Sequence, residues 1–94
     1  MKHSLLSDDK VCYLCKTPND IHKHHIFFGS GRRALSELDG CWCYLCARHH
    51  NMSDKSVHFD RELDLWLKKI CQKKWEEKKG THNDFMRRYG RSYL

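Results

Sequence analysis

The sequence has a single proline, and no stretch of it approaches the roughly 20 consecutive apolar residues that a transmembrane helix needs. With 39% apolar and 32% charged residues, the chain is neither a membrane-spanning protein nor a low-complexity one. The N-terminus also lacks the apolar segment of a secretion signal, because Leu5 and Leu6 are followed closely by Asp8 and Asp9. We therefore expect a protein of the cytoplasm that does not act at a membrane.

A length of 94 residues fits one domain, near the size at which a hydrophobic core alone gives marginal stability. A bound metal would strengthen so small a fold, and the sequence offers six cysteines: Cys12, Cys15, Cys41, Cys43, Cys46 and Cys71. Without a secretion signal, the reducing cytosol favours metal ligation over disulfide bonds. Zinc is therefore the structural metal that we expect.

Positive charge is concentrated in the last third of the chain. The net charge is +6; residues 1–60 carry 8 Lys and Arg against 7 Asp and Glu, whereas residues 61–94 carry 10 against 5. Such a basic region either faces a polyanion or is a solvated, lysine-rich helix surface. Charge alone leaves both interpretations open.

Two short strands are expected in the first half of the chain. Residues 22–28 end in β-forming side chains before Gly29-Ser30-Gly31, and residues 41–46 alternate two sets of side chains as the faces of a strand do. We predict that they pair antiparallel, joined by a loop over 32–40 that includes a helical turn at most. Residues 1–10 are expected to be a lead-in with little structure of its own.

The most regular pattern predicts a helix over residues 61–78, capped by Asp60 and ended by Gly80. Apolar residues recur on its inner face: Leu63, Trp66, Leu67, Ile70 and Trp75. Lysines are expected on its outer face: Lys68, Lys69, Lys73, Lys78 and Lys79. A second, short helix is predicted over residues 82–89, with Phe85, Met86 and Tyr89 packing inward.

The first half of a zinc site is the Cys12-x-x-Cys15 motif, in which a tight turn brings two thiolates to one tetrahedral ion. Its second half has two candidates with suitable spacing, the Cys46-x-x-His49 pair and the Cys43-x-x-Cys46 pair. We favour the former, because the pleat of a strand places Cys43 on the face opposite to Cys46. Cys41 and Cys43, together with Cys71, are then expected to be small buried hydrophobic residues.

Five histidines fall in one region of the chain: His22, His24, His25, His50 and His58. An isolated histidine is more often a surface or core residue than a ligand, and we interpret His3, His22 and His82 in this way. His24 and His25 differ, because adjacent strand residues project to opposite faces. One of them can ligate a metal while the other approaches a substrate.

These motifs, in this order, resemble the HNH endonucleases of the ββα-metal (His-Me finger) superfamily in their zinc-containing treble-clef form. The shared features are the cysteine knuckle, His24-His25-Ile26, Leu45-Cys46-x-x-His49-His50 and a following helix. The likeness is greatest to small phage and prophage HNH proteins, which also share Arg33 and the segments 35–37, 57–58 and 89–94. The resemblance covers most of residues 12–94.

The resemblance implies a small α+β fold: a zinc-stabilised, treble-clef-like ββα-metal domain with a β-hairpin, a long C-terminal helix and a short terminal helix. The single domain, 1–94, would hold the zinc knuckle, hairpin and active site in 12–58 and a basic helical part in 60–94. The structural zinc would be held by Cys12, Cys15, Cys46 and His49.

The resemblance also implies a metal-dependent DNA endonuclease in the cytoplasm of a bacterial host. His25 would be the general base that takes a proton from water as it attacks a phosphodiester bond. His24 and His50 would ligate a catalytic divalent ion, which would be Zn²⁺, Mn²⁺, Ni²⁺ or Mg²⁺. His58 would be the third ligand, with Asn51 and Asp54 as substitutes.

The asparagine that orients the base in the family has no counterpart here, since Asp39, Gly40 and Cys41 occupy its region. We expect a backbone carbonyl or Ser36 to orient His25 instead. DNA phosphates would be bound by basic residues of the loop and the helical part: Arg32, Arg33, Lys69, Lys73, Arg87 and Arg88. The oligomeric state, monomer or homodimer, is left open by the sequence.

The main alternative is a non-catalytic zinc-binding module that binds nucleic acid or a phage protein. Such a module would have no need of His25. A thiol redox protein built on Cys12 and Cys15 is disfavoured, because no thioredoxin-like βαβ pattern surrounds the motif.

Overall fold

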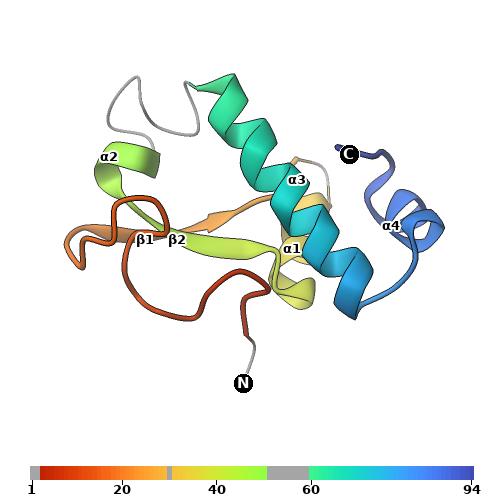
Figure 1. Ribbon diagram of the computed structural model, residues 1–94, viewed down its shortest axis with the longest axis horizontal. Helices are drawn as coiled ribbons and strands as arrows, with labels where there is room; N and C mark the ends of the chain where they lie inside the picture. The colour runs from red at the N-terminus through yellow and green to blue at the C-terminus, as the bar shows by residue number, and fades with distance from the viewer. Residues whose placement is uncertain (1–2, 30, 51–59) are drawn as a thin grey trace.

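The computed structural model describes residues 3–29, 31–50 and 60–94, which form a small α+β fold built from one hairpin and several helices (Figure 1). The elements, in chain order, are β1 (Ile21–His25), α1 (Arg32–Asp39), β2 (Trp42–Cys46), α2 (Ala47–His50), α3 (Arg61–Lys78) and α4 (His82–Tyr89). The predicted helices 61–78 and 82–89 are confirmed at both ends. No helix in the described part of the chain is both long and apolar enough to cross a membrane.

β1 and β2 pair antiparallel, as predicted, with Ile21 opposite Cys46 and His25 opposite Trp42. β1 is shorter than the predicted strand, because its ladder ends at His25. Beyond it, the hydroxyl of Ser36 takes the place of a strand neighbour: it accepts a hydrogen bond from the Phe27 backbone N–H (3.1 Å) and donates one to the Phe27 carbonyl (2.7 Å). Phe27 therefore turns into the core, where it is fully buried.

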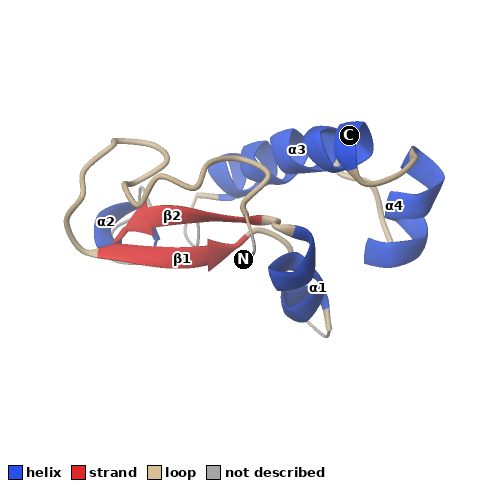
Figure 2. Ribbon diagram, turned by 90° about the horizontal axis from the view of Figure 1, so that it is seen from below, coloured by secondary structure: helices blue, strands red, loops and turns tan. Residues whose placement is uncertain are grey.

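The predicted loop over 32–40 is wrong, because this segment forms α1 at the end of the hairpin (Figure 2). Gly40 ends the helix with a φ of 80°, and a Cβ at this position would collide with the backbone of His3. The N-terminal lead-in contains no helix or strand between residues 3 and 10, yet it is docked: the Leu5 N–H donates to the Gly40 carbonyl over 2.8 Å. Glycine at position 40 thus permits both the helix end and this close approach.

The core is centred on Phe27, whose ring lies 5.3 Å from Phe85, 4.6 Å from Tyr89 and 5.4 Å from Tyr93, measured between ring centroids. These aromatic side chains bring the end of β1, α4 and the C-terminal tail together, with α3 lying over one face of the hairpin (Figures 1 and 2). Burial of several such rings supplies much of the apolar surface that so small a chain can remove from water.

Helix α3 begins as predicted, since the Asp60 carboxylate accepts a hydrogen bond from the Leu63 N–H over 3.1 Å. Its buried face differs from the prediction: Trp66 is 46% exposed and Lys68 only 8% exposed. The Lys68 ammonium is held by Asp64 at 2.6 Å and lies 4.4 Å from the centroid of the Phe28 ring. A paired cation over an aromatic face can be buried at low cost, so the buried stripe can include this lysine.

Helix α4 is stabilised at its start by a capping box between Thr81 and Asp84. Phe85 and Tyr89 are buried as predicted, but Met86 is 37% exposed and does not pack inward.

Asp39, the last residue of α1, joins this helix to α3 and α4. Its carboxylate accepts hydrogen bonds from Trp75 Nε1 (2.9 Å), from Tyr89 Oη (2.8 Å) and from two guanidinium nitrogens of Arg88 (2.6 and 2.8 Å). Burial raises the pKa of Asp39, but the bonds from Arg88, Trp75 and Tyr89 outweigh it and hold the pKa below the ordinary value. Asp39 therefore stabilises the fold as a carboxylate.

We expect Asp39→Ala to lower the free energy of unfolding by roughly 3–5 kcal/mol, since it leaves a buried indole N–H, a buried phenol and a guanidinium without their acceptor. Chemical denaturation at pH 7 measures this loss, with Asp9→Ala, an exposed carboxylate, as the matched control. Because the folded-state pKa is lowered, the contribution of Asp39 is present above the unfolded-state pKa of about 3.9 and is lost as pH falls through the folded-state pKa. The difference between wild type and variant should therefore shrink below about pH 4.

Candidate functional site

Four predicted zinc ligands converge on one point: Cys12, Cys15, Cys46 and His49, whose ligand atoms all lie within 4.8 Å of one another. The Cys15 and Cys46 sulfurs are 3.7 Å apart, and His49 Nδ1 lies 3.5 Å from the Cys12 sulfur and 3.3 Å from the Cys46 sulfur. A tetrahedron with zinc–sulfur bonds of about 2.3 Å and zinc–nitrogen bonds of about 2.0 Å has edges of roughly 3.5–3.8 Å. The cluster can therefore hold a metal ion, and its donors suit a structural zinc.

The zinc knuckle is placed beside β2 by backbone bonds. The Tyr13 N–H donates to the Tyr44 carbonyl over 2.8 Å, and the tight turn is closed by the Lys16 N–H on the Cys12 carbonyl, also at 2.8 Å. Lys16 takes the left-handed conformation, with a φ of 66°, as this turn requires. Cys46 at the end of β2 and His49 in α2 then reach the same point from the other side.

Thiolate formation in the cluster is helped at Cys12. Burial raises the pKa of this thiol, but backbone N–H groups of Cys15, Cys46 and Leu14 outweigh it and lower the pKa to about 6. The pKa of Cys46 is raised by burial and by the neighbouring thiols of Cys15 and Cys12. A cation among these donors would relieve that repulsion, because thiolates are the ligand form.

The remaining cysteines are core residues, as predicted. Cys41, Cys43 and Cys71 are fully buried and lie outside the metal cluster found among the described residues. Burial raises the pKa of Cys43 to about 12, which keeps it a neutral thiol. The choice of Cys46 and His49 as the second ligand pair therefore agrees with the structure.

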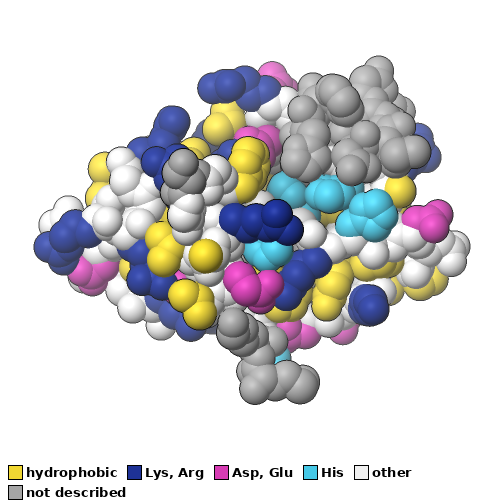
Figure 3. Space-filling model, turned by 180° about the vertical axis from the view of Figure 1, so that it is seen from behind, with side chains coloured by type: hydrophobic (Ala, Val, Ile, Leu, Met, Phe, Trp, Pro, Cys, Tyr) yellow, Lys and Arg dark blue, Asp and Glu magenta, His cyan; other side chains and the backbone are white. Residues whose placement is uncertain are grey.

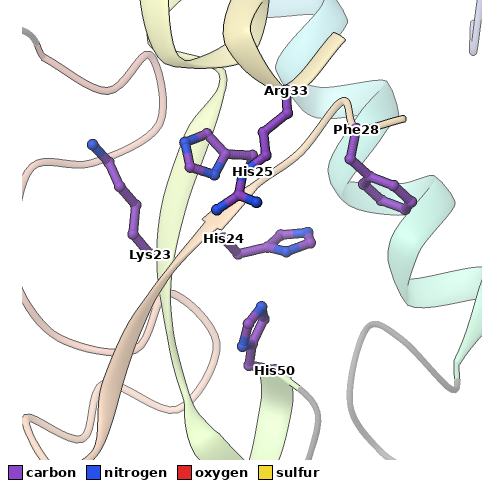
Figure 4. A pocket seen from close by; sticks show the side chains of 6 residues that line it. All are labelled: Lys23, His24, His25, Phe28, Arg33 and His50. Carbon is purple, nitrogen blue, oxygen red and sulfur yellow. The ribbon is translucent and has the colours of Figure 1, made fainter. Parts of the chain in front are cut away.

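One pocket of about 270 Å³ is lined by four predicted site residues, His24, His25, Arg33 and His50, together with Lys23 and Phe28, which were not predicted (Figure 4). The rings of His24 and His50 meet edge to face, with centroids 5.4 Å apart and an interplanar angle of 65°, His24 coming from β1 and His50 from α2. His24 is almost fully buried, and His50 is partly exposed. The predicted third ligand His58 and its substitutes Asn51 and Asp54 lie outside the described residues.

His22 was interpreted as a surface or core residue rather than a ligand, and the structure shows that it has a histidine partner. Its Nδ1 lies 3.1 Å from Nδ1 of His50, so one of the two nitrogens donates a hydrogen bond to the other. His22 and His24 share a face of β1 because they are two residues apart, and α2 brings His50 against that face. The spacing was visible in the sequence, but the position of α2 was not.

Ser36, one of the two predicted orienters of His25, is engaged with the backbone of Phe27. The contact is made instead by Glu37, whose Oε1 lies 3.0 Å from His25 Nε2. Both oxygens of Glu37 also accept from Lys23 Nζ at 2.9 Å. Hydrogen bonds from Lys23 and then from His25 lower the pKa of Glu37 to about 2, so it is ionised at neutral pH.

The predicted phosphate-binding residues occupy different environments. Arg33 lines the histidine pocket, and Lys69 and Lys73 lie beside the exposed Trp66 on α3. Arg87 forms an ion pair with Asp84 at 2.5 Å. Arg88 forms an ion pair with Asp39, so its guanidinium helps to stabilise the fold.

The face of the molecule that carries these histidines is shown in Figure 3. Histidine side chains gather in one area of this face, with basic and acidic side chains directly beside them. Arg33 and Lys23 are the cations that line the histidine pocket among the described residues.

Comparisons with protein-family models, with curated proteins and with solved structures found no match to this chain. The chemistry of the site must therefore be judged from its own residues. Neighbouring imidazoles can share a divalent ion, a third imidazole can accept a proton, and a guanidinium can hold a phosphate oxygen.

Proposed function

We propose that the chain is a metal-dependent DNA endonuclease of the ββα-metal type, on a treble-clef-like scaffold held by a structural zinc. The observation that carries the proposal is the convergence of His24, His50, His25 and Arg33 on one pocket, in which His50 directly follows the cluster residue His49 in α2. A zinc-binding module without catalytic activity would need the cluster but not the pocket.

In this proposal His24 and His50 hold a divalent ion together with a ligand from residues 51–58. Their imidazole nitrogens suit a first-row divalent metal. When bound, the ion supplies charge stabilisation at the phosphate and at the leaving 3′ oxygen. His22 contacts His50 through their Nδ1 atoms and would orient the ring of His50 for ligation.

His25 is the general base. It removes a proton from a water molecule whose oxygen forms a bond to phosphorus, while the bond from phosphorus to the 3′ oxygen breaks. The products are a 5′ phosphate and a 3′ hydroxyl, the latter protonated from solvent. Arg33 binds a non-bridging oxygen of the same phosphate and so places the phosphorus next to His25.

The test is a cleavage assay on supercoiled plasmid with Mg²⁺, Mn²⁺, Ni²⁺ or Zn²⁺ added to the zinc-loaded protein. We expect nicking that requires an added ion and that falls at least about 100-fold in His24→Ala, because an ion ligand and its charge stabilisation are lost. The matched control is His82→Ala, which removes an exposed histidine paired with Glu76 and should leave the rate unchanged.

Binding of DNA without cleavage under any of these ions would favour the non-catalytic module. Cleavage that persists in His24→Ala would show that the ion is held elsewhere.

A further inference from the structure

Glu37 belongs to α1 and contacts His25 of the histidine pocket, and none of the roles assigned above to the pocket residues uses it. It contacts His25 from α1, two residues before the end of that helix, while Lys23 contacts Glu37 from β1. The same Lys23 ammonium lies 4.2 Å from the centroid of the Trp42 ring on β2. Glu37 is therefore fixed by partners on the hairpin and is one-third exposed, with a side-chain exposure of 34%.

The contact with His25 decides where the proton of that ring lies. An ionised carboxylate can only accept hydrogen bonds, and the cation of Lys23 keeps Glu37 ionised. The 3.0 Å contact of Oε1 with His25 Nε2 therefore requires that Nε2 carries the proton. In the neutral ring, Nδ1 is then the nitrogen with the unprotonated lone pair.

The free nitrogen faces the pocket. Figure 4 shows His25 with one ring nitrogen turned toward the guanidinium of Arg33 and the other turned away from it. Nε2 is occupied by Glu37 on the side of α1, so the nitrogen that faces Arg33 is Nδ1. A guanidinium has only donors, which suits a lone pair on the facing nitrogen and disfavours an N–H there.

We propose that Glu37 is the positioning residue of His25, and that its carboxylate holds the ring in the Nε2–H tautomer with Nδ1 directed at the substrate phosphate. Glu37 would thus take the role that the asparagine plays in the HNH proteins that the sequence resembles. The catalytic part of this inference rests on the proposed nuclease function, whereas the tautomer can be tested without it.

The first experiment measures the tautomer directly in the zinc-loaded protein. Long-range proton–nitrogen NMR spectra are recorded above the pH at which the His25 signals stop moving. We expect an unprotonated Nδ1 and a protonated Nε2 in wild type, and a mixture of both tautomers in Glu37→Ala. Wild type with a protonated Nδ1, or Glu37→Ala with an unchanged tautomer, would overturn the proposal.

Two further variants separate positioning from structure. Glu37→Gln keeps a carbonyl oxygen that can accept from Nε2–H, so it should retain the wild-type tautomer in part. Glu76→Ala is the matched control, because it removes a carboxylate that pairs with His82 at the same distance of 3.0 Å. It should leave the His25 signals unchanged.

The second experiment uses plasmid cleavage with saturating divalent ion. We expect Glu37→Ala to lower kcat by about 10- to 100-fold with little change in KM, the loss typical when the partner that orients a functional histidine is removed. Glu37→Gln should restore part of the rate. Equal kcat in wild type and Glu37→Ala would contradict the catalytic part of the proposal, while absence of cleavage in wild type would contradict the nuclease function and leave the tautomer result standing.

Discussion

We expect Cys46→Ser to release the structural zinc and to leave the chain largely unfolded at room temperature. Cys46 ends β2 and directly precedes α2. Without its thiolate, the metal ion would no longer connect the cysteine knuckle to the hairpin and to His49. A structural zinc supplies about 10–16 kcal/mol of apparent binding free energy, which equals or exceeds the roughly 5–15 kcal/mol by which small domains are stable. Zinc content by elemental analysis and far-ultraviolet circular dichroism measure the two losses.

The control for this prediction is Cys43→Ala, which removes a buried thiol outside the metal cluster. It should keep one zinc per chain and a cooperative unfolding transition, with a modest loss of stability from the small cavity. A chelator added to wild type should reproduce the effect of Cys46→Ser. Retention of zinc and fold by Cys46→Ser would show that the other three donors suffice.

The features that were predictable from the sequence are those specified by nearby residues. Helix α3 begins at a cap made by Asp60 on the Leu63 N–H, three residues away, and α4 begins at a capping box of the same span. The four residues of the Cys/His cluster are likewise recognisable in the sequence as two pairs with a fixed short spacing. Local rules are therefore enough to place these elements.

Helix α1 was missed because its support is distant in the sequence. It begins after Gly31 without a side-chain cap, and one of its two leucines, Leu38, is exposed. Ser36 bonds to Phe27, and Asp39 bonds to Trp75, 36 positions away. The helix is thus fixed by tertiary contacts that no periodicity within residues 32–39 could indicate.

The buried side of α3 was misjudged for a similar reason. The Lys68 side chain is charged, but it forms an ion pair with Asp64, and its ammonium lies over the ring of Phe28 in a cation–π contact. Trp66 lies on the other side of the helix, beside Lys69 and Lys73. Which of the two is buried depends on where the end of β1 presents Phe28, and this is a property of the fold.

The same distinction between local patterns and tertiary contacts applies to the candidate site. His24, His25 and His50 were found from their pattern, whereas Glu37 and His22 act through contacts made across the fold. Glu37 could be related to His25 only once α1 was known to be a helix facing the strand. Residues that hold functional side chains in place are therefore harder to predict than those side chains themselves.

The second large effect that we predict is the loss of cleavage in His25→Ala. A general base contributes about 10²- to 10⁴-fold to the rate, so we expect plasmid nicking to fall by that factor at saturating ion. The fold should remain intact, because Glu37 stays paired with Lys23 and the site remains in contact with solvent. Single-turnover cleavage measures the chemical step without interference from product release.

The comparison of His25→Ala with His24→Ala distinguishes a base from an ion ligand. His25→Ala should retain its structural zinc, its affinity for DNA and its affinity for an added divalent ion, the last measured by titration calorimetry. His24→Ala should lose affinity for the added ion, because an imidazole donor is removed from the ion site. Cleavage that is unchanged in His25→Ala would exclude this residue as the base, and loss of ion affinity in that variant would make it a ligand instead.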